Sequence, residues 1–244
     1  MSNGSSRVIT PRDAATVMLV RNAPDLQVFM LRRNFDSIWI AGASVFPGGA
    51  IDPHDRDLDW EARARGLDDA GASTALGVER GGLGFFVGAI RETFEEAGVL
   101  LAHGPDGEPA DGRALHFTAA RDALNSGALT FADFVRDHDL VLAADELKVF
   151  SHWITPEGSP RRYDTWFFIG AAPDGTYEHD NAELIESAWI RPSDALSAAD
   201  RGEMDLIFPT RKSLEVLAQF DRAEGALAST RSGVTESPTG GVMG

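Results

Sequence analysis

The sequence contains no cysteine, so neither disulfide bonds nor thiol chemistry contributes to its stability or activity. No apolar run approaches the roughly 18 residues that a membrane-spanning helix needs, and the first residues lack the apolar core of a signal peptide. Positive charge is also scarce: 22 lysines and arginines stand against 38 acidic residues, a net charge of −16. This balance argues against nucleic acid or an anionic membrane as a partner. We therefore expect a soluble, cytoplasmic protein.

The most informative feature present is a cluster of carboxylates in residues 91–99, which read Arg-Glu-Thr-Phe-Glu-Glu-Ala-Gly-Val. On an α-helix, residues three and four apart share a face, so Glu92, Glu95 and Glu96 lie together. Arg91 lies one turn before Glu95. Like charges this close repel one another, and more strongly where water is excluded. A hard divalent cation bound by the carboxylate oxygens would relieve this repulsion.

The helix expected around this cluster has one apolar and one acidic face. At about 100° per residue, the apolar stripe comprises Leu83, Phe86, Val87, Ile90, Phe94 and Ala97. Gly88 lies on the acidic face, where a glycine costs roughly 1 kcal/mol relative to alanine, and we interpret it as leaving room for whatever the carboxylates bind. Gly98 is placed to end the helix in a left-handed conformation. The alternative, an ordinary solvated helix face, is weakened by the lack of interleaved lysines.

A glycine pair precedes this helix, in the segment Val45-Phe46-Pro47-Gly48-Gly49-Ala50-Ile51-Asp52. Paired glycines permit sharp turns and let backbone groups approach a ligand closely, although alone they indicate only a turn. Together with the acidic helix, they make the chain resemble a Nudix hydrolase. The signature of that family is Gly, five residues, Glu, seven residues and then Arg-Glu-hydrophobic-x-Glu-Glu-x-Gly-hydrophobic. Its second half matches from Arg91 to Val99, with Thr93 in the usual hydrophobic slot.

The first half of the signature matches at Gly49, but its spacing differs. The usual spacing would place the next acidic residue at Asp55 and the helix arginine eight residues after it, whereas Arg91 follows much later. The intervening segment, about residues 53–82, therefore reads as an insertion. The sequence leaves open whether Asp55 or Glu79 replaces the first signature glutamate, or whether neither does.

The insertion and several later segments are similar to the peroxisomal coenzyme A diphosphatase branch of the family. The later segments are His152-Trp153-Ile154-Thr155-Pro156, Arg161 to Phe168, and Phe208 to Lys212. The resemblance covers most of residues 13–220. Its carboxylate half is highly specific, and the assignment to a branch is less so.

The resemblance implies a diphosphatase, in which water attacks phosphorus with the help of a divalent cation. It implies that Glu92, Glu95, Glu96 and the carbonyl of Gly48 hold Mg²⁺ or Mn²⁺. It further implies that Arg91 orients Glu95 through a salt bridge rather than contacting substrate. We therefore name Arg91 and the three glutamates as candidate catalytic residues.

The general base and the substrate contacts are less defined by the sequence. Either a helix carboxylate or a later acidic residue, Glu183 or Glu186, would take the proton from water; an exposed acidic turn is the competing interpretation of the later pair. Candidate contacts to the substrate phosphates are Arg32, Arg33, Arg161 and Arg162. Candidate aromatic surfaces for a nucleobase are Trp39, Trp153 and Trp166. Surface, ion-pair or core roles compete with each of these, and the histidines show no metal-ligand spacing.

Three functional hypotheses follow. The favoured one is hydrolysis of coenzyme A or acyl-coenzyme A to 3′,5′-ADP and (acyl-)phosphopantetheine. The second keeps the mechanism but changes the substrate to ADP-ribose, NADH or an oxidised nucleotide. The third is a Nudix-fold sensor that binds a nucleotide without cleaving it. The sequence does not define the oligomeric state, although homodimers are common in the family that the chain resembles.

The coarse pattern of elements predicts an α/β protein with a Nudix-type three-layer α/β/α sandwich, a mixed sheet and additional helices. Strands are expected at 14–20, 26–31, 99–102, 147–154, 163–171 and 187–190, and helices at about 113–125 and 131–138. Ser193 and Thr210 should begin two further helices. We expect a flexible N-terminus over residues 1–12, a single domain over 13–224 and a disordered tail over 225–244.

Overall fold

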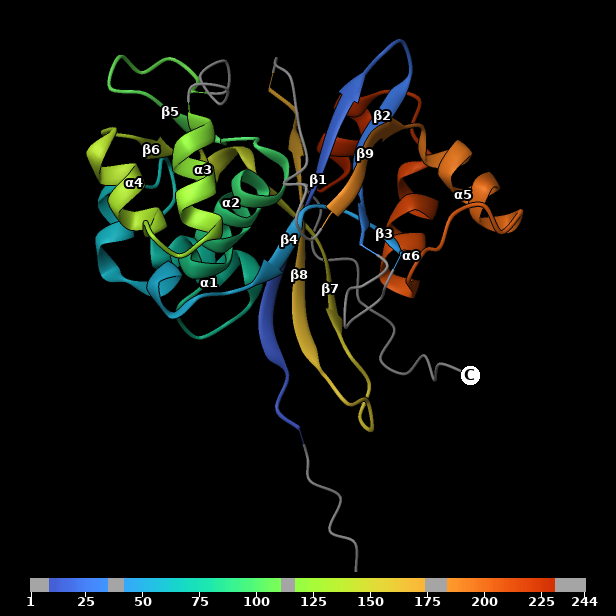
Figure 1. Ribbon diagram of the computed structural model, residues 1–244, viewed down its shortest axis with the longest axis horizontal. Coiled ribbons are helices and arrows are strands. Elements are labelled where there is room, and N and C mark those ends of the chain that lie inside the picture. Colours follow the sequence, from blue (N-terminus) through green and yellow to red (C-terminus); the bar gives the residue numbers. More distant parts are fainter. Residues whose placement is uncertain (1–8, 35–41, 111–116, 174–183, 231–244) are drawn as a thin grey trace, which may run out of the picture.

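The computed structural model describes residues 9–34, 42–110, 117–173 and 184–230, and within them a seven-stranded mixed sheet carries helices on both faces (Figure 1). The main strand order is β3-β2-β1-β8-β7; β4 also pairs with β1, and β9 also pairs with β2. The predicted α/β/α sandwich is therefore confirmed. In the described part of the chain, no helix is long and apolar enough to span a membrane.

The sheet is built around β1 (Arg12–Asn22), which forms the predicted hairpin with β2 (Leu26–Arg33). β1 also runs parallel to β8 (Tyr163–Ala171) over nine residue pairs, and antiparallel to the short β4 (Gly48–Ala50). The remaining strands are β3 (Ser44–Val45), β7 (Lys148–Ile154) and β9 (Leu184–Ile190). Strand β4 thus brings the glycine pair to the middle of the sheet.

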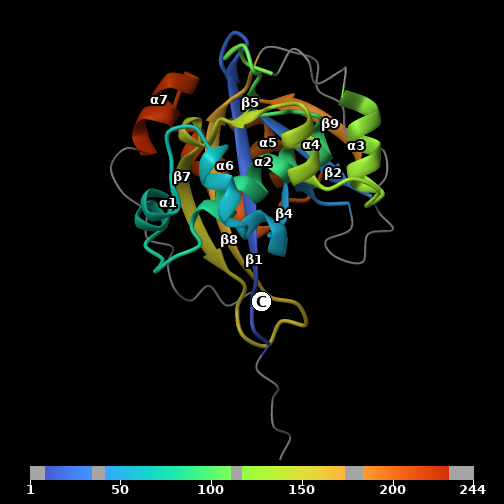
Figure 2. The same cartoon turned by 90° about the vertical axis from the view of Figure 1, so that its left-hand side faces the viewer.

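The protein interior contains two hydrophobic cores, one on each face of the sheet, and side chains of β1 enter them alternately. Ala15, Val17 and Leu19 enter the first core, while Met18 and Val20 enter the second, as expected for side chains that alternate between faces. The first core lies under α1 (Asp69–Leu76), α2 (Leu83–Ala97), α3 (Thr118–Asn125) and α4 (Phe131–Asp137). The second lies under α5 (Pro192–Asp200), α6 (Phe208–Leu217) and α7 (Ala223–Ser229). Figure 2 turns the first group of helices toward the viewer, in front of the sheet.

The predicted insertion is an ordered part of the domain. It folds into 3₁₀ turns at Pro53–Arg56 and Leu58–Ala62, followed by α1. Trp60 is buried in the first core, with its ring 5.7 Å from that of Phe131, and its indole N–H donates to the carbonyl of His54 at 2.8 Å. The insertion therefore contributes to the first core, and both α1 and the 3₁₀ turns contact α2.

The first residues of three helices can be compared with the predictions. The helix expected at about 131–138 is present as α4, and Thr130 caps it, because the Thr130 hydroxyl accepts from the backbone N–H of Asp133 at 3.1 Å. Ser193 and Thr210 do not begin their helices: α5 starts at Pro192 and α6 at Phe208, and neither has a side-chain cap. In both helices a proline occupies the first turn, where its fixed φ is favourable and its missing N–H costs nothing. Thr210 is instead buried inside α6.

Two predicted boundaries and one strand also need correction. Residues 225–229 are not a disordered tail, since α7 buries Ala226 completely in the second core and Ala223 donates its N–H to the Asn22 side chain at 2.8 Å. Arg12, placed in the flexible N-terminus, already belongs to β1. The strand expected at 99–102 is reduced to β5 (Ala102–His103), which pairs with β6 (Val141–Leu142). Residues 1–8 and 231–244 lie outside the described part of the chain.

Candidate active site

The glycine pair packs directly against the acidic face of α2. A Cβ atom on Gly49 would lie 2.5 Å from the carboxylate of Glu92, and one on Gly48 would collide with the backbone of β1 at Ala15 and Thr16. Only glycine allows this approach of β4 to both neighbours. The turn-forming residues of the sequence therefore serve to bring backbone atoms to the carboxylates.

Two of the three predicted glutamates, Glu92 and Glu96, meet this loop, and Arg91 joins the third, Glu95, to Glu92. Glu96 is buried, and its carboxylate accepts from the N–H of Gly48 at 2.8 Å. Glu92 and Glu95 both contact the same guanidinium nitrogen of Arg91, at 2.9 and 2.8 Å. The salt bridge predicted between Arg91 and Glu95 is present, and Arg91 holds Glu92 in the same way.

Asp55 is the partner that fixes Arg91. Its carboxylate is only 2% exposed and accepts two hydrogen bonds from that guanidinium, both at 2.9 Å, in a bidentate pair. Arg91 also donates to the carbonyl of Ala50 at 2.9 Å. Glu79 is exposed. Of the two candidates for the first signature glutamate, Asp55 is therefore the one that joins the site, although the insertion separates it from the helix.

Gly88 has a different role from the one predicted. A Cβ atom there would lie 2.6 Å from Ile51 and 2.8 Å from the carboxylate of Asp55. The glycine therefore makes room for Asp55 and not for a ligand. Thr93 occupies a hydrophobic slot without leaving its hydroxyl unpaired, because the hydroxyl donates to the carbonyl of Ala89 at 2.7 Å.

The electrostatics of the site show an excess of negative charge. Burial raises the pKa of Glu92 to about 7 and also raises the pKa of Glu95, while Arg91 acts in the opposite direction on both. Burial likewise raises the pKa of Asp55, opposed by Arg91. Burial lowers the pKa of Arg91, but its acidic partners outweigh burial and raise it above the usual value. One arginine thus faces several carboxylates in a largely buried environment.

Oxygen donors in this number are the ligands that hard divalent cations prefer. Among the described residues, no three acidic, histidine or cysteine side chains stand in a ready metal-binding arrangement. Two of the three glutamates point at Arg91, so a cation would compete with this guanidinium for their oxygens. The carboxylate oxygens fit a divalent cation chemically. Some of them, on Glu92 and Glu95, are bound to Arg91 in this structure.

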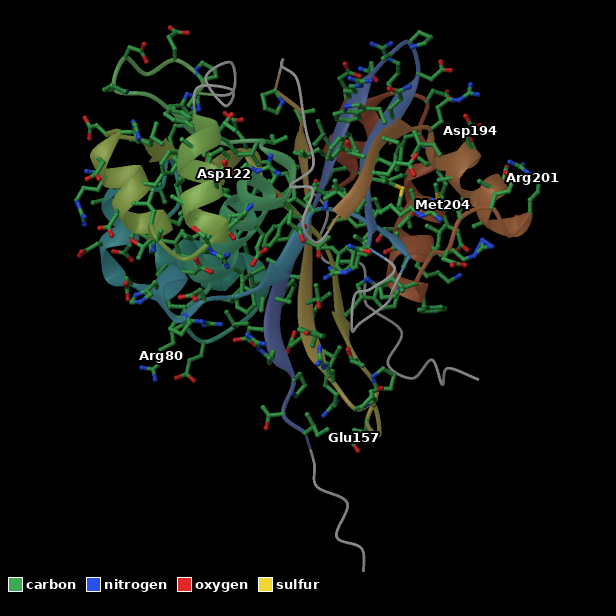
Figure 3. The ribbon with its side chains drawn as sticks, in the orientation of Figure 1. Arg80, Asp122, Glu157, Asp194, Arg201 and Met204 are labelled. Carbon is green, nitrogen blue, oxygen red and sulfur yellow. The ribbon has the colours of Figure 1, made fainter. Side chains whose placement is uncertain are left out.

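In their described contacts, the arginines predicted to bind the substrate phosphates do not meet the α2 carboxylates. Arg32 pairs with Glu186 at 3.5 Å, both side chains being exposed. Arg162 donates to the carbonyls of Thr155 and Ile9, next to the tip of the β7–β8 hairpin that Glu157 marks in Figure 3. Arg161 belongs to the same exposed turn, and Arg33 ends β2 half-buried.

The predicted nucleobase platforms are also occupied by protein. The His152 ring stacks on Trp166 at 3.9 Å, and Trp153 packs edge-on against Phe208 at 5.6 Å. Trp39 and Glu183 lie outside the described residues.

Comparisons with known proteins identify a matching family model and several similar proteins. The family model of the NUDT19 Nudix domain matches residues 68–215. Similar curated proteins include the acyl-coenzyme A diphosphatases NUDT19 of Gallus gallus, 29% identical over 86% of this chain and 68% of that protein, and of Homo sapiens, 30% identical over 81% and 62%. With the Xenopus laevis protein included, the chain spans 55–68% of these relatives' lengths. A crystal structure of a NUDIX hydrolase from Alicyclobacillus acidocaldarius superimposes with a TM-score of 0.74 at 26% identity, over 90% of this chain and 96% of that one.

Proposed function

Because the chain belongs to the Nudix hydrolase family through its NUDT19-type Nudix domain, we propose that it hydrolyses the diphosphate linkage of coenzyme A or acyl-coenzyme A. Water would attack one phosphorus, the bridging P–O bond would break, and the products would be 3′,5′-ADP and (acyl-)phosphopantetheine. The observation that carries this proposal is the packing of Glu92 and Glu96 against the glycine loop, with Glu95 joined to Glu92 through Arg91. The similar curated relatives of this chain are named acyl-coenzyme A diphosphatases.

The residues that would hold Mg²⁺ or Mn²⁺ are Glu92, Glu95, Glu96 and the carbonyl of Gly48. When bound, such a cation supplies neutralisation of the diphosphate charge and a lower pKa for an attacking water. Support comes from the carboxylates of Glu92 and Glu95, which burial makes costly to ionise and which share a single guanidinium nitrogen of Arg91. This cation requirement is part of the proposal.

Each neighbouring residue has a role in this scheme. Arg91 orients Glu92 and Glu95, and it is itself fixed by Asp55 and the carbonyl of Ala50. We assign proton acceptance from the attacking water to one of the helix carboxylates, because Glu186 is engaged by Arg32 at the surface. Glu183, outside the described residues, stays a second candidate.

The test is to incubate the protein with Mg²⁺ or Mn²⁺ and a panel of coenzyme A, an acyl-coenzyme A, ADP-ribose, NADH and 8-oxo-dGTP. Products are identified by mass spectrometry, beside Glu95→Gln and Glu96→Gln. We expect cation-dependent release of 3′,5′-ADP, reduced by about a hundredfold or more in both variants. Glu215→Gln is the matched control, since Glu215 pairs only with Lys212 on the far helix layer among its described side-chain contacts.

The other outcomes separate the alternatives. Turnover of ADP-ribose, NADH or 8-oxo-dGTP with inert coenzyme A compounds would support the second hypothesis. Nucleotide binding without turnover would support the sensor. Absence of any cation-dependent turnover, or wild-type turnover in both glutamate variants, would refute the assignment of the reaction to these residues.

A further inference from the structure

The C-terminal end of α2 combines the carbonyl end of the helix backbone with acidic side chains, and both place negative charge there. The carbonyls of the last turn of a helix lack intrahelical partners, and the helix dipole places partial negative charge there. Basic side chains are favoured at such an end, yet the last turn of α2 contains no basic residue and carries Glu95 and Glu96. Gly98 satisfies only the carbonyl of Phe94, at 2.9 Å. The carbonyls of the two glutamates need another partner.

Arg121 of α3 provides it. Its Nε donates to the carbonyl of Glu95 at 2.8 Å, and a terminal guanidinium nitrogen donates to the carbonyl of Glu96 at 2.7 Å. One planar group therefore joins the backbones of two adjacent candidate metal ligands. Asn125, one turn later on the same face of α3, adds a long hydrogen bond of 3.4 Å to the carbonyl of Glu95.

The packing of α3 holds this guanidinium in place. Phe117, just before α3, packs edge-on against Phe134 of α4 at 5.1 Å, and Phe134 stacks on Phe94 of α2 at 5.1 Å with the rings 10° apart. Phe94 directly precedes Glu95 in the chain. This row of rings ties the three helices together where Arg121 meets α2.

We propose that Arg121 is a positioning residue for the carboxylates of Glu95 and Glu96. It contacts neither carboxylate in the hydrogen bonds described; it fixes the backbone from which both side chains extend, and places a positive charge at the negative helix end. This inference rests on the proposed function for its catalytic consequence. Its structural consequence, a defined arrangement of the metal-binding carboxylates, is measurable without substrate.

The decisive variant is Arg121→Gln, which keeps a polar side chain but removes the charge and the two-pronged donor. We expect kcat to fall 10- to 100-fold with KM little changed, the range seen when partners that orient ligands are removed. We also expect the dissociation constant for Mn²⁺, measured by electron paramagnetic resonance or calorimetry on the full chain, to rise by about tenfold or more. Arg136→Gln is the matched control, because Arg136 makes its described side-chain ion pairs only with Asp133 and Asp137 on the surface of α4.

A second variant guards against simple unfolding. Arg121→Lys keeps the charge at the helix end but offers a single donor nitrogen, so it should fold with an unchanged melting temperature and still lose several-fold in kcat and in Mn²⁺ affinity. Added guanidinium ion should partly restore turnover to Arg121→Ala and leave the wild type unaffected.

The outcomes distinguish this inference from the proposed function. Wild-type kcat and Mn²⁺ affinity in a folded Arg121→Gln would overturn the inference. If that variant does not fold, wild-type values in Arg121→Lys would overturn it equally. A wild type that binds Mn²⁺ but hydrolyses nothing would refute the proposed function, while weaker Mn²⁺ binding in the Arg121 variants would still support the positioning role.

Discussion

Helices cover both faces of the sheet, but the two faces differ in the polar groups that they bury. On the α2 face, charged side chains are buried: Asp55 is 2% exposed and Glu96 is 8% exposed. On the opposite face, the buried polar residues of α6 are hydroxyls, Thr210 and Ser213, and Ser213 donates to the carbonyl of Pro209 at 2.9 Å. Ion pairs on that side, such as Lys212–Glu215, stay at the surface.

This difference indicates where stability and activity are in conflict. Taking carboxylates out of water is costly, and well-packed apolar residues would often replace them at no loss of stability. The protein nevertheless retains them on one face, beside the glycine loop. The opposite face, free of buried charge in the described residues, supports the sheet through apolar packing. Variants of the two faces should therefore affect different properties.

The largest effect should come from Asp55→Ala, which leaves the guanidinium of Arg91 buried with two fewer hydrogen bonds. Hydrogen bonds to charged groups contribute roughly 1.5–3 kcal/mol each, so the loss of two should cost roughly 3–5 kcal/mol of unfolding free energy even though Glu92 and Glu95 still pair with Arg91. Urea unfolding measures this loss, and the turnover of the remaining folded protein should also fall. Asp55→Asn, which keeps one acceptor, should lose less. Equal stability of Asp55→Ala and wild type would show that the ion pair is not structurally important.

Next is Leu214→Ala in the second core, where Leu214 is fully buried. Removing its methyl groups leaves a cavity and costs roughly 2–5 kcal/mol. Because the site lies on the other face, kcat per folded molecule should match the wild type at a temperature where the variant is folded. A parallel loss of kcat would mean that the two faces are coupled.

Gly49→Ala should give a smaller loss of stability with a clear loss of activity. The added methyl would lie 2.5 Å from the Glu92 carboxylate, so the side chain or β4 must move, at a cost of about 1–3 kcal/mol for overpacking. We expect at least tenfold lower kcat, because an ångström-scale misplacement of reactive groups can cost about a hundredfold. Steady-state kinetics beside urea unfolding separates the two effects, and unchanged kcat would contradict close packing of the loop on Glu92.

The smallest effect should follow Glu215→Gln on α6. Its ion pair with Lys212, 2.7 Å long, is exposed on both sides, and such pairs contribute less than about 1 kcal/mol. Both the melting temperature and kcat should stay near wild type. A large loss of stability here would remove the contrast between the buried charges of one face and the surface charges of the other.

The sequence contains enough information to predict the carboxylate face of α2, because helical periodicity and the adjacent glycines are local properties. It does not predict the partner of Arg91. Asp55 and Glu79 are both acidic residues before the helix, and only the folded insertion shows that Asp55 is buried against the guanidinium. Helical periodicity places Gly88 correctly on the acidic face of α2. The space beside it is filled by Asp55 and not by a ligand, as only the folded structure shows.

Other errors have the same origin in tertiary contacts. A composition rich in Ser, Thr and Gly suggested disorder from residue 225, but burial of Ala226 against the second core makes α7 a helix. Arg121 carries no local signal, because its hydrogen-bond acceptors are 25 and 26 residues earlier in the chain. These positions are determined by which helices meet, and no local pattern encodes that.

The parallel pairing of β1 with β8 has a consequence for how the protein is made. Arg12 pairs with Tyr163, so the partners are about 150 residues apart, and one edge of β1 has no mate until much of the chain has been synthesised. Contacts this distant in sequence slow folding, and an open strand edge invites pairing with other chains. A nascent chain that ends before β8 would therefore carry the complete carboxylate helix on an unfinished sheet. That edge is open to pairing with other chains until β8 is in place.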